Sequence, residues 1–163
     1  EYLIDCGHKK IGHVTGEMKT KTARDRLAGY KLALKDNQIA IDDNLIIEGD
    51  YSRESGYDAI QKMVDDQLPT AVFMANDLMA IGAYRALDKH DLKVPADISI
   101  IGHDDINVAS LVKPGLTTMI QPKNKMGQIA AESLINLIED KTEEAQDVIL
   151  TTELIKRGSS QII

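Results

Sequence analysis

Aromatic residues, cysteine and long apolar runs are all scarce in this sequence of 163 residues. Aromatic side chains make up 4% of it, with no tryptophan and one phenylalanine, so the core must be largely aliphatic. The single cysteine, Cys6, excludes an internal disulfide framework and fits a reducing compartment. No apolar run approaches the roughly 20 residues that a membrane-spanning helix needs.

Positive charge is also in short supply. The sequence has 19 Lys and Arg against 26 Asp and Glu, which gives a net charge of -7. Contact with phosphate backbones needs a basic face, so this stretch is not expected to hold DNA, RNA or an anionic membrane by itself. The patterns GxxxxGK[ST] and GxSxG are absent, and no metal-type spacing of His, Cys and Asp occurs. We therefore expect a protein that binds no metal ion or cofactor and is not an enzyme.

What the sequence does contain is a strand, a polar corner and a helix within residues 69–87, PTAVFMANDLMAIGAYRAL. Residues 71–75 are an apolar run too short for a helix, which favours a strand buried on both faces. Asp77 is predicted to cap the helix that follows. In open α/β sheets such corners lie outside the carboxyl ends of the strands, where ligands bind.

The same alternation of strand and helix continues along the chain, and 43% of the residues are hydrophobic, enough to build a core. It predicts an α/β fold with an open, doubly wound parallel sheet. The helix at 78–90 is small or apolar nearly all round, so a second layer or a partner chain is expected to cover it. Strands are expected at 11–15, 45–48, 71–75, 98–101, 116–120 and 147–155, and helices at 1–6, 23–37, after Ser52, at 78–90, 107–112 and 123–139.

Parallel strands bring their carboxyl-terminal corners to one rim of the sheet. Together the corner residues offer a carboxylate, a guanidinium, amides and an aromatic face, which suit a neutral, hydroxyl-rich ligand. No cluster of positive charge is present, so a phosphate would be held poorly. The rim residues are 17–22, Arg26, Tyr51, Asn76, Asp77, 103–105 and Gln121.

Five blocks of sequence follow one another in a familiar order. They are RLAGY (26–30), EGDYSRESGY (48–57), PTAVFMANDLMAIGA (69–83), VPADISIIGHDD (94–105) and PGLTTMIQP (114–122). Together with CGHKKIGHVTG and ELIKRGSS, they resemble the lactose-repressor (LacI/GalR) family over essentially the whole chain. The resemblance implies the effector-binding core of a bacterial transcription regulator, with one lobe of a type I periplasmic-binding-protein-like fold.

By this resemblance, residues 1–121 form the second lobe, 122–150 belong to a truncated first lobe, and 151–163 return to the second. The opening residues read as the inside of a helix, which indicates a fragment. The resemblance implies a cytoplasmic homodimer that binds a small-molecule effector, a sugar in preference to a purine. Operator DNA would be bound through a helix-turn-helix head that lies outside this chain.

The resemblance also assigns roles to individual residues. Ligand contacts are expected from Thr22, Arg26, Tyr51, Asn76, Asp104 and Gln121. A dimer contact is expected from Ile81 on the helix at 78–90 and from Leu111 and Val112 in the loop that follows. His103 departs from the usual family pattern, which has Tyr or Phe there, and would add a pH-sensitive group to the pocket.

Other interpretations remain open at this point. Asn76 and Tyr51 fit local packing as well as ligand contact, Asp77 fits a helix cap, and Asp105 fits a turn. A sugar-binding protein of an ABC transporter would have the same rim chemistry. An enzyme or phosphoacceptor using Asp77, Asp104 and Asp105 would need a metal or phosphate cradle. Finally, the helix at 123–139 carries an apolar stripe without its covering lobe, so the isolated chain is expected to associate.

Overall fold

The structure, a computed structural model, describes residues 1–139 and 147–163 and is built on a mixed sheet. Five strands are parallel, as predicted, and the last is antiparallel to its neighbour. In spatial order the strands are β2 (Ile46–Glu48), β1 (Ile11–Thr15), β3 (Ala71–Met74), β4 (Ser99–His103), β5 (Thr117–Ile120) and β6 (Glu153–Ile155).

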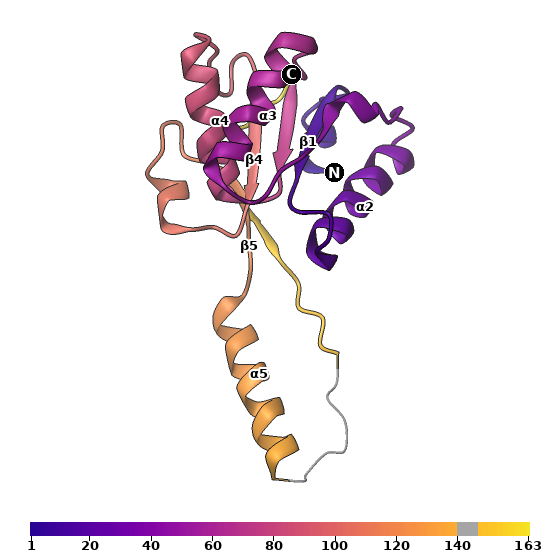
Figure 1. Cartoon of the computed structure of the whole chain (residues 1–163), viewed down its shortest axis with the longest axis vertical. Coiled ribbons are helices and arrows are strands. Elements are labelled where there is room, and N and C mark those ends of the chain that lie inside the picture. Colours follow the sequence, from indigo (N-terminus) through magenta and orange to yellow (C-terminus); the bar gives the residue numbers. More distant parts are fainter. Residues whose placement is uncertain (140–146) are drawn as a thin grey trace.

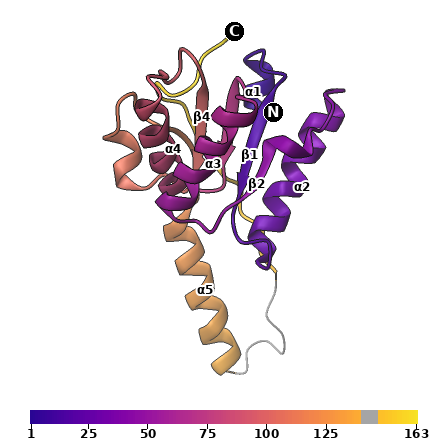
Figure 2. The same ribbon diagram turned by 45° about the horizontal axis from the view of Figure 1, so that its top comes forward.

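Helices cover both faces of the sheet, which confirms the doubly wound α/β fold. Helices α3 (Arg53–Asp66) and α4 (Asp77–Lys89) lie together on one side, and α2 (Lys21–Asp36) lies on the other (Figure 1). The short α1 (Tyr2–Asp5) lies near the amino-terminal end of β1, visible in the turned view (Figure 2). The 3-10 segments are η1 (Asp43–Leu45) and η2 (Asn107–Ser110).

Alternate residues of β3 point into two separate aliphatic cores. Val72 and Met74 belong to the cluster that α3 and α4 complete. Ala71 belongs to the cluster of α1 and α2, against which Phe73 also packs. The uninterrupted apolar run therefore serves both faces of the sheet, which is the physical reason for its lack of polar alternation.

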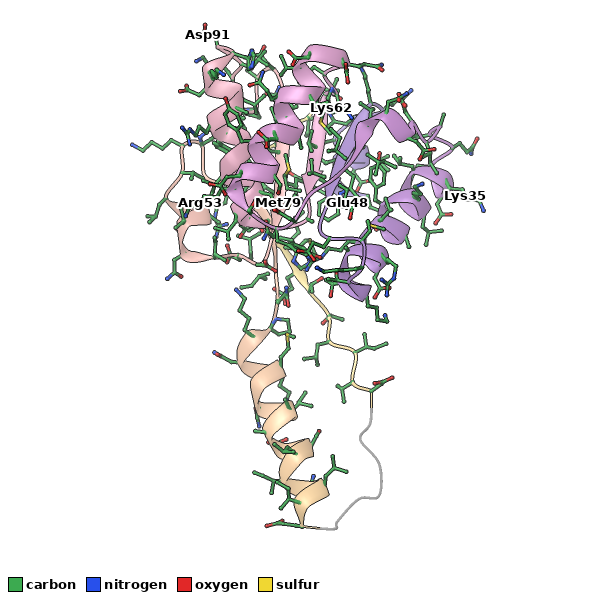
Figure 3. The ribbon with its side chains drawn as sticks, in the orientation of Figure 1. Lys35, Glu48, Arg53, Lys62, Met79 and Asp91 are labelled. Atoms are coloured by element: carbon green, nitrogen blue, oxygen red, sulfur yellow. The ribbon has the colours of Figure 1, made fainter. Side chains whose placement is uncertain are left out.

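A second layer covers α4, as expected, and it is α3 that does so. The two helices approach through glycines: a Cβ on Gly82 would lie 1.9 Å from the Arg53 carbonyl oxygen, and one on Gly56 would lie 2.1 Å from the Met79 carbonyl oxygen. Met79 itself is fully buried beneath α3, at the centre of the labelled view (Figure 3). Only a residue without a side chain permits this spacing.

Two local predictions were wrong. Asn76, not Asp77, caps α4: its side-chain oxygen accepts from the Met79 amide at 2.9 Å. The expected strand at 147–155 shrinks to Glu153–Ile155, because β6 pairs only with β5 and Glu153 lies opposite Ile120, the last residue of β5. The preceding stretch runs past the end of its partner strand, and Ile149 is 95% exposed there.

Helix α5 (Lys123–Ile138) extends away from the sheet and its covering helices (Figure 1). None of its residues is buried, and Met126, Leu134, Ile135 and Ile138 are exposed. The apolar stripe is therefore uncovered, as the sequence indicated. The domain boundaries at 121 and 150 stay predictions, and residues 140–146 of that middle segment lie outside the described residues.

Candidate functional site

The strand order places a topological switch point between β1 and β3. The chain moves outward from β1 to β2 and then returns to the other side of β1 for β3. The connections that follow β1 and β3 therefore diverge, and ligands of open α/β sheets bind where such connections part. At this point the Tyr51 ring lies directly over Gly16, where a Cβ would come within 1.9 Å of the ring. Arg26 of α2 donates through Nη1 to the Ala75 carbonyl oxygen at 2.8 Å.

Three of the predicted ligand residues are brought into one network. Gln121 Nε2 donates to Asp104 Oδ1 at 2.6 Å, and Arg26 Nη2 lies 3.8 Å from the same oxygen. His103 joins them, with its Nδ1 3.2 Å from Arg26 Nη2 and 3.0 Å from Asp104 Oδ1. The loops after β4 and β5 and the helix after β1 thus converge on one carboxylate.

The Asp104 carboxylate is stabilised in its ionised form. Burial opposes ionisation, but the hydrogen bonds and charges of His103, Arg26 and Gln121 outweigh it, so the pKa of Asp104 is lowered. Its backbone is left-handed, with φ at 109°, and Lys123 Nζ donates to its carbonyl oxygen at 2.5 Å. The site therefore offers a fixed negative acceptor beside a guanidinium, which fits paired hydroxyl groups.

Asn76 and Tyr51 belong to the same corner and support each other. Asn76 is 8% exposed; while its oxygen caps α4, its Nδ2 donates to the Tyr51 carbonyl oxygen at 3.0 Å. Tyr51 has a φ of 69°, and its hydroxyl lies 3.2 Å from Thr20 Oγ1. Both residues thus have structural roles. A ligand contact by either residue remains a prediction. The side-chain oxygen and nitrogen of Asn76 can each form one further hydrogen bond.

Thr22 is the predicted residue that the structure does not join to the others. Its side chain is exposed and forms no hydrogen bond among the described residues, so its ligand role stays a prediction. Sequence reasoning placed Thr20 on the rim without a role of its own; in the structure, Thr20 caps α2 by accepting from the Ala23 amide and also meets Tyr51. Sequence reasoning missed Lys123; the available signal was a polar side chain two residues after the predicted rim residue Gln121.

The remaining acidic residues of the rim have structural partners. Asp105, at φ 47°, forms an ion pair with Arg157 at 2.8 Å, consistent with the turn interpretation. Asp77 is fully buried and accepts hydrogen bonds from the Thr118 hydroxyl and the Ile106 amide. Burial raises the pKa of Asp77, although these two bonds oppose the shift.

An apolar cavity of about 480 Å³ lies between α1, α2 and the sheet. It meets the polar network only at Arg26 and His103; the rest of its lining is mostly aliphatic and aromatic, including Leu34, Phe73 and Ile101. Its chemistry does not match a hydroxyl-rich ligand, so the polar rim is the better candidate site.

The predicted dimer residues lie on and beside α4. Ile81 and Val112 are partly exposed, and Leu111, just after η2, is 73% exposed. The Tyr84 hydroxyl donates to the Pro114 carbonyl oxygen at 2.9 Å and so ties this loop to the helix. The three residues sit on structurally connected elements, and their dimer role stays a prediction.

Within the described residues, no group of three or more His, Cys, Asp and Glu side chains is arranged to hold a metal ion. Over the same ranges, none of the helices combines the length and hydropathy required to cross a bilayer.

Comparison with known families decides the relationship. The sequence model of the periplasmic binding protein-like domain matches residues 1–160. The chain belongs to this family. Its relatives include the HTH-type transcriptional repressor PurR of Klebsiella pneumoniae, 42% identical over 159 residues, which are 97% of this chain and 47% of the relative. The ribose operon repressor of Escherichia coli is 43% identical over 161 residues, 98% of this chain and 49% of the relative.

Solved structures agree with the sequence comparison. The complex of the transcriptional regulator CelR with cellobiose superposes with a TM-score of 0.94 at 34% identity, over 98% of this chain and 49% of that one. The lac repressor dimer bound to operator and the anti-inducer ONPF superposes with a TM-score of 0.89 at 36% identity. The match covers 98% of this chain and 55% of that one. The resemblance to LacI-type repressors is thereby confirmed, and these relatives are named as transcriptional regulators or repressors, not as enzymes. The chain spans about half the length of the curated relatives it matches.

Proposed function

We propose that this periplasmic binding protein-like chain is part of the effector-binding core of a LacI-type transcription regulator. The observation that carries the proposal is the network of Arg26, Asp104 and Gln121, which joins the helix after β1 to the loops after β4 and β5. A guanidinium fork, an ionised carboxylate and an amide match the donors and acceptors of a sugar. A purine is the second candidate.

The wider assignment rests on the relatives. Residues 1–121 and 151–163 would form one lobe, and 122–150 would reach into the other, with the effector between them. The net charge of -7 supports operator binding by a head outside these residues. We propose a cytoplasmic, non-enzymatic homodimer in which Ile81, Leu111 and Val112 meet the partner. The effector would act by binding two lobe arrangements with different affinity.

Calorimetry on the intact polypeptide that carries this sequence tests the effector site. The ligands are D-ribose, cellobiose and hypoxanthine, and the variants are Asp104→Ala and the exposed control Asp58→Ala on α3. We expect one ligand to bind, Asp104→Ala to weaken it at least tenfold, which is about 1.4 kcal/mol, and the control to leave it unchanged. Absence of binding by all three, with no effect on operator affinity, would contradict the proposal.

A second measurement tests the dimer surface. Leu111→Asp should shift the intact protein toward monomer in analytical ultracentrifugation, because it puts a charge into a buried apolar contact. Leu32→Asp is the matched control: Leu32 is also exposed, at 57%, but lies on α2. Equal effects of the two variants would remove the support for this surface.

The transport-type sugar-binding protein remains the alternative function. The rim chemistry is compatible with it, but the relatives named above are repressors. The segment encoded upstream of Glu1 separates the two: a helix-turn-helix pattern supports the regulator, and a secretion signal supports the transporter.

A further inference from the structure

One short stretch of the chain holds Asp104 at three points. The Asp104 amide donates to the Met119 carbonyl oxygen at 2.8 Å. Gln121 Nε2 donates to the Asp104 carboxylate at 2.6 Å, and Lys123 Nζ donates to the Asp104 carbonyl oxygen at 2.5 Å. Met119 belongs to β5, Gln121 follows that strand, and Lys123 is the first residue of α5. The backbone and the side chain of Asp104 are thus both held by the segment that leaves the sheet.

The hydrogen bond from Lys123 is the part of this arrangement that involves α5. The helix points away from the sheet, and none of its residues is buried (Figure 1). Within residues 1–139 and 147–163, the other polar side chains of α5 form no hydrogen bond or ion pair with the sheet or its covering helices. One side chain therefore makes the polar link between α5 and the candidate site.

Asp104 has a backbone conformation that residues with a side chain rarely adopt. Its φ of 109° lies in the left-handed region, and such a conformation persists only where neighbouring groups hold it. Here hydrogen bonds act on both sides of its Cα, through Met119 on the amide and through Lys123 on the carbonyl. Because the backbone at Cα sets the direction of the side chain, the bond from Lys123 also helps to aim the carboxylate.

We propose that Lys123 is a positioning residue of the effector site, which holds the Asp104 backbone in the conformation that presents its carboxylate to the ligand. The inference rests on the proposed function for its ligand. Lys123 acts through Asp104 and does not itself contact the effector. A movement of α5 that withdraws Lys123 therefore weakens the site, and by linkage a bound effector favours the arrangement in which this bond is made.

The loop that follows has its own supports, so loss of the bond from α5 should not unfold it. Asp105 forms an ion pair with Arg157 at 2.8 Å, and the Ile106 amide donates to the buried Asp77 at 2.9 Å. Three successive residues are thus held from α5, from the segment after β6 and from α4. Replacement of Lys123 releases one of these three attachments and leaves the other two.

Calorimetry on the intact polypeptide tests the positioning role. The probe is D-ribose, cellobiose or hypoxanthine, whichever binds to wild type. Lys123→Met keeps an unbranched side chain without the donor and should weaken binding about tenfold, because one hydrogen bond from a charged group is lost. Lys123→Arg retains a cationic donor and should restore most of the affinity. Lys125→Met removes an exposed lysine two residues further along α5 and should bind as wild type does.

A double-mutant cycle separates positioning from direct contact with the ligand. Asp104→Gly removes the carboxylate and adopts a φ of 109° without strain, so its fold should persist. In that background Lys123→Met should cause no further loss of affinity, since no carboxylate is left to aim. Losses that add would show that Lys123 acts on the ligand directly and would overturn the inference. Equal affinity of Lys123→Met and wild type would overturn it as well.

A measurement without ligand keeps this inference separate from the proposed function. Because Gln121 Nε2 donates to the Asp104 carboxylate, hydrogen exchange of the Gln121 side-chain amide, followed by NMR, reports whether the carboxylate keeps its place. Exchange should be about tenfold faster in Lys123→Met than in wild type or Lys125→Met. Unchanged exchange overturns the inference, whether or not a ligand binds. If exchange accelerates but all three probes fail to bind, the positioning role stands and the proposed function fails.

Discussion

Asp77 accepts a hydrogen bond from the Thr118 hydroxyl at 2.5 Å and so joins the first turn of α4 to the middle of β5. Its second oxygen accepts from the Ile106 amide, which anchors the loop after β4. A Cβ on Gly102 would lie 2.2 Å from the carboxylate, so β4 leaves room for it. One buried side chain therefore fixes the position of the loop that carries Asp104.

Replacement of Asp77 should destabilise the fold in a pH-dependent way. Asp77→Ala leaves a buried hydroxyl and a buried amide without their acceptor, at a cost of about 1–3 kcal/mol. Burial raises the pKa of Asp77 above 3.8. The contribution of Asp77 to the free energy of unfolding is therefore largest below pH 3.8. It is lost as pH rises through the raised pKa of Asp77 in the folded protein. The free energy of unfolding in urea should therefore vary with pH differently in wild type and in Asp77→Asn. Parallel pH profiles of the two proteins would contradict this prediction.

His13 should make the protein sensitive to acid. It is fully buried, and burial lowers its pKa from 6.5 to about 4, with a smaller contribution from the charge of Arg26. The unfolded chain takes up a proton near 6.5 and the folded chain does not, so stability falls from about pH 7 toward pH 4 by up to about 3 kcal/mol. His13→Phe, which keeps an aromatic ring against Tyr30 and Phe73, should remove this part of the slope, and His90→Gln should not.

The contact between α3 and α4 should tolerate no added methyl group. Gly82→Ala would place its Cβ against the backbone of α3, which cannot move aside as a side chain can, so we expect a loss of about 3 kcal/mol or more. Gly29→Ala is the matched change on α2: nothing lies within 4 Å of its Cβ. Because alanine favours helix, that variant should gain about 0.5–1 kcal/mol. In thermal unfolding, Gly82→Ala should lower the melting temperature and Gly29→Ala should raise it.

The exposed stripe of α5 should cause the isolated 163-residue chain to associate. Leu134→Glu places a charge at the centre of the stripe, where Leu134 is 59% exposed, and should shift the chain toward monomer in light scattering. Gln128→Glu adds the same charge on another side of the helix and should leave the species distribution unchanged. A wild-type chain that is monomeric at high concentration would show that the stripe does not self-associate.

Much of the fold was predictable because its signals are local. The apolar run at 71–75 and the Ser52 cap of α3 each depend on a few neighbouring residues, and the structure has both. The choice between Asn76 and Asp77 as the cap was not local, because it depends on Thr118 and Ile106, which reach Asp77 only in the folded chain. The antiparallel direction of β6 likewise depends on where the chain returns after α5.

The site shows the same division. Parallel strand order was enough to predict that Arg26, Asp104 and Gln121 would meet, because each follows a strand at the same edge. The contacts of His103 with Arg26 and Asp104 depend on distances of a few ångströms between separate elements, which no spacing in the sequence encodes. Thr20, and not the predicted ligand residue Thr22, meets Tyr51, which reflects where the first turn of α2 begins, a boundary that sequence patterns fix poorly.

The pairing of Ile120 with Glu153 means that the chain departs from the sheet and comes back to it at a single place. Everything from 121 to 152 is therefore a detour between two adjacent strands, topologically an enlarged hairpin loop. Replacing that detour with a short reverse turn would leave every parallel strand pair intact. The sheet and its covering helices thus form a module that could be separated from α5 by one internal deletion in the gene.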